Sequence, residues 1–144
     1  EALKLARLGV FDHWAETPQG ALGLIILLDQ VSRNIQRGSP LAFAGDAKAL
    51  SLAKMAVSRG YHQKLVAPLA MWLLMPFEHA EDLDAQHRCV ALFASIGLKD
   101  MVYWAQLHLD IIARFGRFPH RDAVLGRKST AEEIAFLQAG GFSG

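Results

Sequence analysis

Apolar residues recur at spacings of three and four along almost the whole chain, and a strict alternation of apolar and polar residues is absent. Spacings of three and four place side chains on one face of a helix, whereas alternation is typical of a half-buried strand. Glycine and proline divide this pattern into separate segments. The sequence therefore predicts an all-α fold built from several helices and no sheet.

The residues between these segments predict where the helices begin and end. Thr17 followed by Pro18 predicts the start of a helix over residues 18–34, after an opening helical segment. Further helices are expected over residues 46–59 and 65–75, the latter broken or kinked by Pro76. Asp82 and Asp100 are candidate N-caps of helices that run to residues 97 and 115.

A capping-box pattern that begins at Ser129 predicts a short terminal helix. Residues 117–128 are expected to form a longer, basic loop, whereas the other linkers are only a few residues long. Short linkers make consecutive helices antiparallel hairpins, and we expect these hairpins to stack.

A chain of 144 residues fits a single domain, and we expect one α-helical domain over residues 1–144. Hydrophobic residues make up 52% and charged residues 20%, which is a more apolar composition than usual for a globular protein. We therefore expect a partner or a further part of the chain to cover some of the apolar surface. The first residue is Glu1, and the opening segment reads as the middle of an amphipathic helix without an N-cap. We therefore expect the full-length protein to carry an additional N-terminal segment.

Charge and cysteine content argue against several classes of partner. A net charge of +1 supplies no general attraction for nucleic acid or an anionic membrane. No apolar run approaches the roughly 20 residues that a membrane span needs. The single cysteine, Cys89, forms no internal disulfide, which favours a cytoplasmic protein. The sequence does not decide whether the protein forms a homo-oligomer.

The apolar stripe of the helix predicted over residues 18–34 ends in charged side chains. On a helical wheel Leu22, Ile25 and Ile26 share an arc with Asp29 and Arg33. Asp29 and Arg33 are four positions apart and able to pair, and a buried charge needs a partner because its desolvation is costly. This favours a structural ion pair, with a functional site as the alternative.

Two further residues lie in the middle of apolar helix faces. We expect His108 to be buried and hydrogen-bonded to a backbone or carboxyl group, because it lies at the centre of the apolar arc of its helix. Cys89 is flanked by apolar residues on its own face, and its basic sequence neighbours point elsewhere. We therefore expect an inert buried thiol.

Two irregular segments gather ionisable groups. Residues 76–82 place Glu78 and His79 at a helix junction, where they suit acid and base roles, although no metal-binding spacing such as His-Glu-x-x-His is present. Residues 115–122 place Arg117, His120 and Arg121 among aromatic and turn-forming residues. Arginine's planar fork suits carboxylate or phosphate, and pairing with helix carboxylates is the structural alternative.

These segments resemble the bacterial family called domain of unknown function 924, of the tetratricopeptide-like (TPR-like) helical superfamily. The likeness lies in Leu-Leu-Asp-Gln-Val-Ser-Arg-Asn at 27–34 with Arg-Gly at 37–38, in Pro-Phe-Glu-His at 76–79 with Glu-Asp at 81–82, and in Arg-Phe-Gly-Arg-Phe-Pro-His-Arg at 114–121 with Leu-Gly-Arg at 125–127. It extends from about residue 22 to the end of the chain. The resemblance implies a TPR-like stack of helical hairpins and an additional N-terminal segment, and it implies no activity.

The chain departs from the family pattern at three places. The family has Phe-Pro where Val31 and Ser32 stand, an aromatic residue near Gln36, and Asn at Asp122. These departures leave a ligand contact by Gln36 or Asp122 without support from the resemblance.

We expect the three polar segments to converge on one pocket, whose candidate ligand-binding residues are Asp29, Arg33, Asn34, Glu78, His79, His120 and Arg121. The leading hypothesis is a binding or scaffold module for a small anionic or zwitterionic ligand or a peptide terminus. One alternative is a hydrolase-type enzyme with Glu78 and His79 as acid and base, in which an arginine stabilises negative charge. Another is a purely structural ion-pair network. Neither a cofactor nor a metal is expected.

Overall fold

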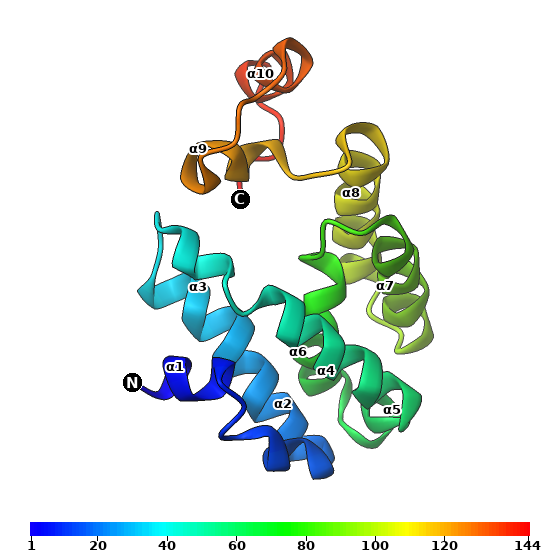
Figure 1. Cartoon of the computed structure of the whole chain (residues 1–144). Coiled ribbons are helices and arrows are strands. Elements are labelled where there is room, and N and C mark those ends of the chain that lie inside the picture. The colour runs from blue at the N-terminus through cyan, green and yellow to red at the C-terminus, as the bar shows by residue number, and fades with distance from the viewer.

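The computed structural model describes residues 1–144 and consists of helices and turns, without a strand (Figure 1). The first half contains α1 (Ala2–Arg7), the 3-10 turn η1 (Asp12–Glu16), α2 (Pro18–Ile26), the π-helical turn η2 (Leu27–Val31), α3 (Ser32–Ile35), the 3-10 turn η3 (Pro40–Phe43), α4 (Asp46–Ser58) and α5 (Tyr61–Lys64). The second half contains α6 (Ala67–Glu78), α7 (Leu83–Ser95), α8 (Lys99–Phe115), the 3-10 turn η4 (Pro119–Arg121), α9 (Asp122–Leu125) and α10 (Ala131–Gln138). The all-α prediction is confirmed.

The helix predicted over residues 18–34 is present, but it is not α-helical throughout. Thr17 caps it by accepting a hydrogen bond from the Gly20 backbone N–H at 3.1 Å, and Pro18 occupies the first turn. The elements α2, η2 and α3 follow one another without a break. The π-helical turn between them was not predicted, because the apolar spacing does not distinguish one wider turn from its neighbours.

The prediction that the helix ends at residue 75, before Pro76, is wrong. Helix α6 begins at Ala67 and continues through Pro76 to Glu78. Proline removes only one backbone donor there, and the turn is completed by the His79 N–H, which donates to the Met75 carbonyl at 3.0 Å. The helix therefore carries Glu78 in its last turn and His79 at its C-cap.

The predicted caps of the later helices have mixed outcomes. The Asp82 side chain accepts a hydrogen bond from the Ala85 N–H at 2.8 Å, as predicted. Asp100 is not an N-cap, because α8 begins one residue earlier and Leu98 precedes it without a side-chain bond. The capping box of α10 joins Thr130 and Glu133, one residue later than the pattern suggested.

The helices pack around a core in which α2 contacts α4 and α6, and α6 contacts α7. Helices α7 and α8 form a tightly packed hairpin (Figure 1). Fully buried Ile25, Leu73, Phe77 and Phe93 belong to the main apolar cluster. Cys89 belongs to it as well, and burial raises the pKa of its thiol well above the ordinary value, which confirms its predicted burial.

The C-terminal part of the chain returns toward the first half. Figure 1 shows α9 on the side of the molecule where α3 ends, although these segments are far apart in the sequence. The Arg121 guanidinium, next to α9, stacks on the ring of Phe43 in η3 with its central carbon 4.8 Å from the ring centroid. None of the helices combines the length and apolar character needed to cross a bilayer.

Candidate functional site

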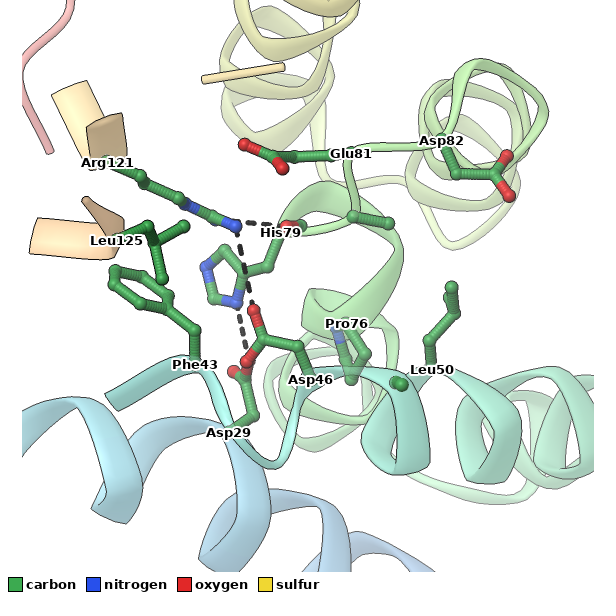
Figure 2. Close-up of a pocket in the computed structure, with 12 residues that line it drawn as sticks. Asp29, Phe43, Asp46, Leu50, Pro76, His79, Glu81, Asp82, Arg121 and Leu125 are labelled. Carbon is green, nitrogen blue, oxygen red and sulfur yellow. Dashed lines mark hydrogen bonds and ion pairs between the residues drawn. The ribbon is translucent and has the colours of Figure 1, made fainter. Parts of the chain in front are cut away.

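A cleft lies where η2, η3, the end of α6 and the α9 region meet. It consists of two adjoining cavities, of about 360 Å³ and about 540 Å³. Phe43, His79 and Arg121 line both cavities and therefore join them. Figure 2 shows the His79 ring between the Arg121 side chain and the carboxylate of Asp29.

The buried carboxylate of Asp29 organises one wall of this cleft. Asp29 lies in the π-helical turn and is 1% exposed. His79 Nδ1 donates to its Oδ1 at 2.7 Å, and Arg33 Nη2 lies 3.3 Å from the same oxygen. Burial raises the pKa of Asp29, but His79 and Arg33 outweigh this effect, so the pKa lies below its ordinary value. The predicted pairing of Asp29 with Arg33 is confirmed.

Asp46 extends the network across the cleft. Its Oδ2 lies 3.0 Å from Arg33 Nη2 and 3.6 Å from Arg121 Nη1, whereas its Oδ1 has no hydrogen-bond partner. Burial raises the pKa of Asp46 above its ordinary value despite the two arginines. Asp29, Arg33, Asp46, His79 and Arg121 are called the cleft cluster below.

Arg121 is the least satisfied member of the cleft cluster. It is 7% exposed, and its single hydrogen bond runs from Nη2 to the His79 carbonyl at 3.0 Å. Its Nε is buried without a partner. The guanidinium also packs over Phe118, at 4.5 Å from the ring centroid. Burial, reinforced by the nearby positive charge of Arg33, lowers the pKa of Arg121 to about 10.

Glu78 and Asn34 line neither cavity. The Glu78 carboxylate is buried, with Oε1 at 3.4 Å from His108 Nδ1 and Oε2 without a partner. Burial, and next the charge of Asp29, raises the pKa of Glu78 to about 7. The exposed Asn34 side chain donates to the Gln30 carbonyl at 3.1 Å. Glu78 and His79 are adjacent in the sequence, but they do not pair with each other: His79 pairs with Asp29, and Glu78 lies near His108.

Two histidines form the far wall of the larger cavity. His108 Nδ1 donates to the Trp104 carbonyl at 2.8 Å, and burial lowers the pKa of His108 to about 4. Its predicted burial and backbone hydrogen bond are confirmed. Burial also lowers the pKa of His120 to about 4, and its Nδ1 has no partner. The ring of Phe142 meets both histidines edge-on, and both imidazoles are neutral at pH 7.

Five of the seven sequence-predicted residues therefore line the cleft: Asp29, Arg33, His79, His120 and Arg121. The sequence does not indicate a site at Phe43 or Asp46, because Asp46 stands at the predicted start of a helix. Gly45 precedes that helix, and Asp46 makes no capping bond, so its carboxylate is free to reach Arg33. No group of three or more His, Cys, Asp or Glu side chains is arranged to hold a metal ion.

A second polar network holds the loop that carries Arg121. We call it the C-terminal clamp, and its residues are Glu81, Arg117, Asp122, Arg127 and Glu133. Arg127 Nη1 and Nη2 donate to both Glu81 oxygens at 2.6 and 2.9 Å, and Arg127 Nε donates to Asp122 at 2.8 Å. Arg117 donates to both Glu133 oxygens, each at 2.7 Å. These bidentate pairs fix the position of η4 and α9.

Two of the departures from the family pattern, Asp122 and Gln36, have structural contacts. Asp122 is 1% exposed and belongs to the C-terminal clamp, where Ser129 also donates to it at 2.9 Å. Gln36 accepts a hydrogen bond from Arg7 at 2.6 Å, outside the cleft.

A bacterial protein family of unknown function, DUF924, matches residues 1–141. The chain belongs to this family. No curated protein matches it. A protein of unknown function from Agrobacterium tumefaciens, ATU0120, is 39% identical and superposes with a TM-score of 0.91. The alignment covers 96% of this chain and 78% of the Agrobacterium chain. Both matches support the expected family, while the TPR-like stacking of the hairpins stays a prediction.

Proposed function

We propose that this DUF924 protein is a binding module whose cleft holds a small ligand through an anionic group. The observation that carries the proposal is the state of Arg121, which is buried with one hydrogen bond although a guanidinium has five N–H donors. Buried donors are normally satisfied, because an unpaired one costs about 1–3 kcal/mol. A carboxylate or phosphate oxygen is the natural partner for the donors of Arg121.

The charge of the larger cavity supports the same proposal. Its positive charge comes from Arg33, Arg37 and Arg121, and no Asp or Glu side chain lines it. The exposed Arg37 takes part in no ion pair. Phe43 lies under Arg33 and Arg121 at 5.3 and 4.8 Å, which holds both guanidinium planes in place. A volume of about 540 Å³ suits a small molecule.

Calorimetric titration with inorganic phosphate and succinate tests this proposal. We expect one of these anions to bind in a one-to-one complex, and Arg121→Met to weaken binding at least tenfold. Arg114→Met serves as the matched control, because Arg114 is exposed and pairs with Glu132 away from the cleft. Absence of binding by both anions, or equal weakening by the two variants, would contradict the proposal.

The pairing of His79 with Asp29 favours a second candidate, a hydrolase-type enzyme. The carboxylate holds the proton on Nδ1 and leaves Nε2 as the basic nitrogen, which makes no hydrogen bond. The residue that assists His79 is then Asp29 rather than Glu78, and Arg121 stabilises developing negative charge.

Nitrophenyl esters and nitrophenyl phosphates test this second candidate. If the protein is a hydrolase, the wild type hydrolyses at least one of these nitrophenyl compounds. His79→Gln and Asp29→Asn then reduce the rate of hydrolysis by about 10²-fold or more. A wild type that hydrolyses none of them, or a His79→Gln variant that keeps full activity, contradicts a catalytic role for His79.

A further inference from the structure

The larger cavity contains a buried hydrogen-bond acceptor that the protein itself does not use. Arginine side chains only donate, so the acceptors among the side chains that line this cavity are three imidazoles and the hydroxyl of Ser143. His108 is the most buried of the three histidines, with a side chain that is 9% exposed. Buried polar groups normally have a hydrogen-bond partner, so the state of each nitrogen of His108 matters.

The contacts of Nδ1 fix which nitrogen of His108 is the acceptor. A carbonyl oxygen only accepts, so the 2.8 Å contact of Nδ1 with the Trp104 carbonyl places the ring proton on Nδ1. Burial lowers the pKa of His108 to about 4, so the ring is neutral at pH 7 and Nε2 carries a lone pair. No group of the protein donates to this Nε2, which, unlike His120 Nδ1, keeps access to solvent.

Aromatic rings hold the His108 imidazole in place and bring it close to Arg121. Phe142 and Phe118 meet the imidazole edge-on, with ring centroids 4.7 and 5.5 Å away. The Arg121 guanidinium packs over the same Phe118 ring, at 4.5 Å from its centroid. The donors of Arg121 and the acceptor of His108 therefore lie near each other in the wall of one cavity, where a single small ligand reaches both.

The anion proposed for Arg121 does not satisfy this acceptor. An ionised carboxylate or phosphate oxygen only accepts hydrogen bonds, whereas Nε2 of His108 needs a donor. A positively charged donor is disfavoured, because three arginines and no Asp or Glu side chain line the larger cavity. A hydroxyl group is the smallest uncharged donor that meets the need.

We propose that the cleft binds a hydroxylated anion, whose carboxylate or phosphate group binds Arg121 and whose hydroxyl group donates to His108 Nε2. This inference rests on the proposed anion binding and adds a second recognition group to the ligand. The ligand class is that of hydroxycarboxylates and phosphate esters of polyols. His108 then determines specificity, because a site that hydrogen-bonds a hydroxyl group discriminates against the analogue that lacks it.

Calorimetric titration with matched ligands tests the inference. Butyrate is compared with hydroxybutyrates whose hydroxyl lies on the second, third or fourth carbon, and propyl phosphate is compared with glycerol phosphate. We expect the best hydroxylated ligand to bind the wild type at least tenfold more tightly than its counterpart without the hydroxyl, a difference of about 1.4 kcal/mol. A preference in one series alone supports the inference and identifies the anionic group.

His108→Phe is the decisive variant. Phenylalanine resembles imidazole in shape and keeps the contacts with Phe118 and Phe142, but it has no acceptor. We expect it to weaken only the hydroxylated ligand, so that the preference falls below threefold, whereas Arg121→Met should weaken both members of a pair alike. His62→Phe is the matched control, because His62 in α5 is also buried and lines neither cavity.

The outcomes separate this inference from the proposed function. Anions that bind equally well with and without the hydroxyl overturn the inference and leave anion binding intact. A preference that His108→Phe leaves unchanged overturns it too. If neither carboxylates nor phosphates bind, both proposals fail. His108→Gln, which returns an amide oxygen near the position of Nε2, should restore part of the preference, and urea unfolding of each variant establishes that a lost preference is not lost folding.

Discussion

The cleft cluster and the C-terminal clamp contain the same types of charged side chain, but they differ in how completely these side chains are hydrogen-bonded. In the clamp, Arg127 forms four hydrogen bonds, and both oxygens of Asp122 accept one. In the cleft, Arg121 forms one hydrogen bond, and one oxygen of Asp46 has no partner. The clamp is thus complete within the protein, whereas the cleft cluster has unused donors and acceptors.

The pKa shifts of the two regions follow this difference. In the clamp, hydrogen bonds from Arg117 lower the pKa of Glu133 to about 2. Around the cleft, burial lowers the pKa of Arg121 to about 10 and raises that of Glu78 to about 7. Partners therefore favour the charged form of Glu133 in the clamp, and burial favours the neutral forms of Arg121 and Glu78 around the cleft, where Asp29 alone of the cleft cluster has its pKa lowered by its partners. A saturated network indicates a structural role, and an unsaturated one indicates a site that a ligand completes.

The largest expected effect is in the clamp. Asp122→Ala should lower the free energy of unfolding by roughly 3–5 kcal/mol, because it removes a buried carboxylate that accepts from Arg127 and Ser129 and lies 3.3 Å from Arg117. Urea unfolding followed by circular dichroism measures the change. Asp110→Ala, which removes an exposed carboxylate from α8, is the control and should change stability little. Equal costs for the two variants would mean that the clamp is not structural.

In contrast to Asp122→Ala, a substitution that removes the charge of Glu78 should stabilise the protein, by an amount that depends on pH. Its pKa is raised from 4.5 to about 7 in the folded protein, so the unfolded chain gives up its proton first as the pH rises. The stability that its neutral form maintains is complete below about pH 4.5 and is lost as the pH rises through about 7.

Glu78→Gln should therefore stabilise the protein by up to about 3 kcal/mol at pH 8 and by almost nothing at pH 4. Urea unfolding at both pH values measures this difference. Glu132→Gln, at a carboxylate that is 61% exposed, is the control. A Glu78→Gln variant with the same stability gain at both pH values rules out the raised pKa.

The pair of Asp29 and Arg33 should show a smaller coupling. Each residue has a second partner, because Asp29 also accepts from His79 and Arg33 also pairs with Asp46. A double-mutant cycle with Asp29→Ala and Arg33→Ala should give an interaction energy of about 1–2 kcal/mol. Simple additivity of the two single changes would show that the pair does not stabilise the fold.

The smallest expected effect on stability comes from Arg121. Arg121→Met should leave the free energy of unfolding within about 1 kcal/mol of the wild type, because it removes a buried charge that has few hydrogen bonds. The same substitution at Arg127 in the clamp should cost about 2–3 kcal/mol. If Arg121→Met lowers the free energy of unfolding as much as Arg127→Met does, Arg121 is a structural residue. The cleft cluster and the clamp would then both be structural networks.

Local patterns were sufficient for much of the fold and for parts of the site. Thr17, Asp82 and Gly116 mark helix ends through contacts with residues a few positions away, so the sequence carries their signal. The pair of Asp29 and Arg33 and the burial of His108 follow from helical spacing for the same reason. The prediction for Pro76 is wrong, because the loss of one backbone donor near the end of a helix does not prevent a further turn, and α6 continues to Glu78.

The sequence alone determined the all-α class, most helix boundaries and which polar residues stand on apolar faces, because these depend on interactions within one or two helical turns. Only the tertiary structure decided that His79 pairs with Asp29, that Glu78 faces His108, and that Asp46 and Phe43 join the cleft. These contacts connect segments far apart in the chain. Their partners are chosen by helix packing and by the cost of leaving a buried charge unpaired, and no local pattern encodes that choice.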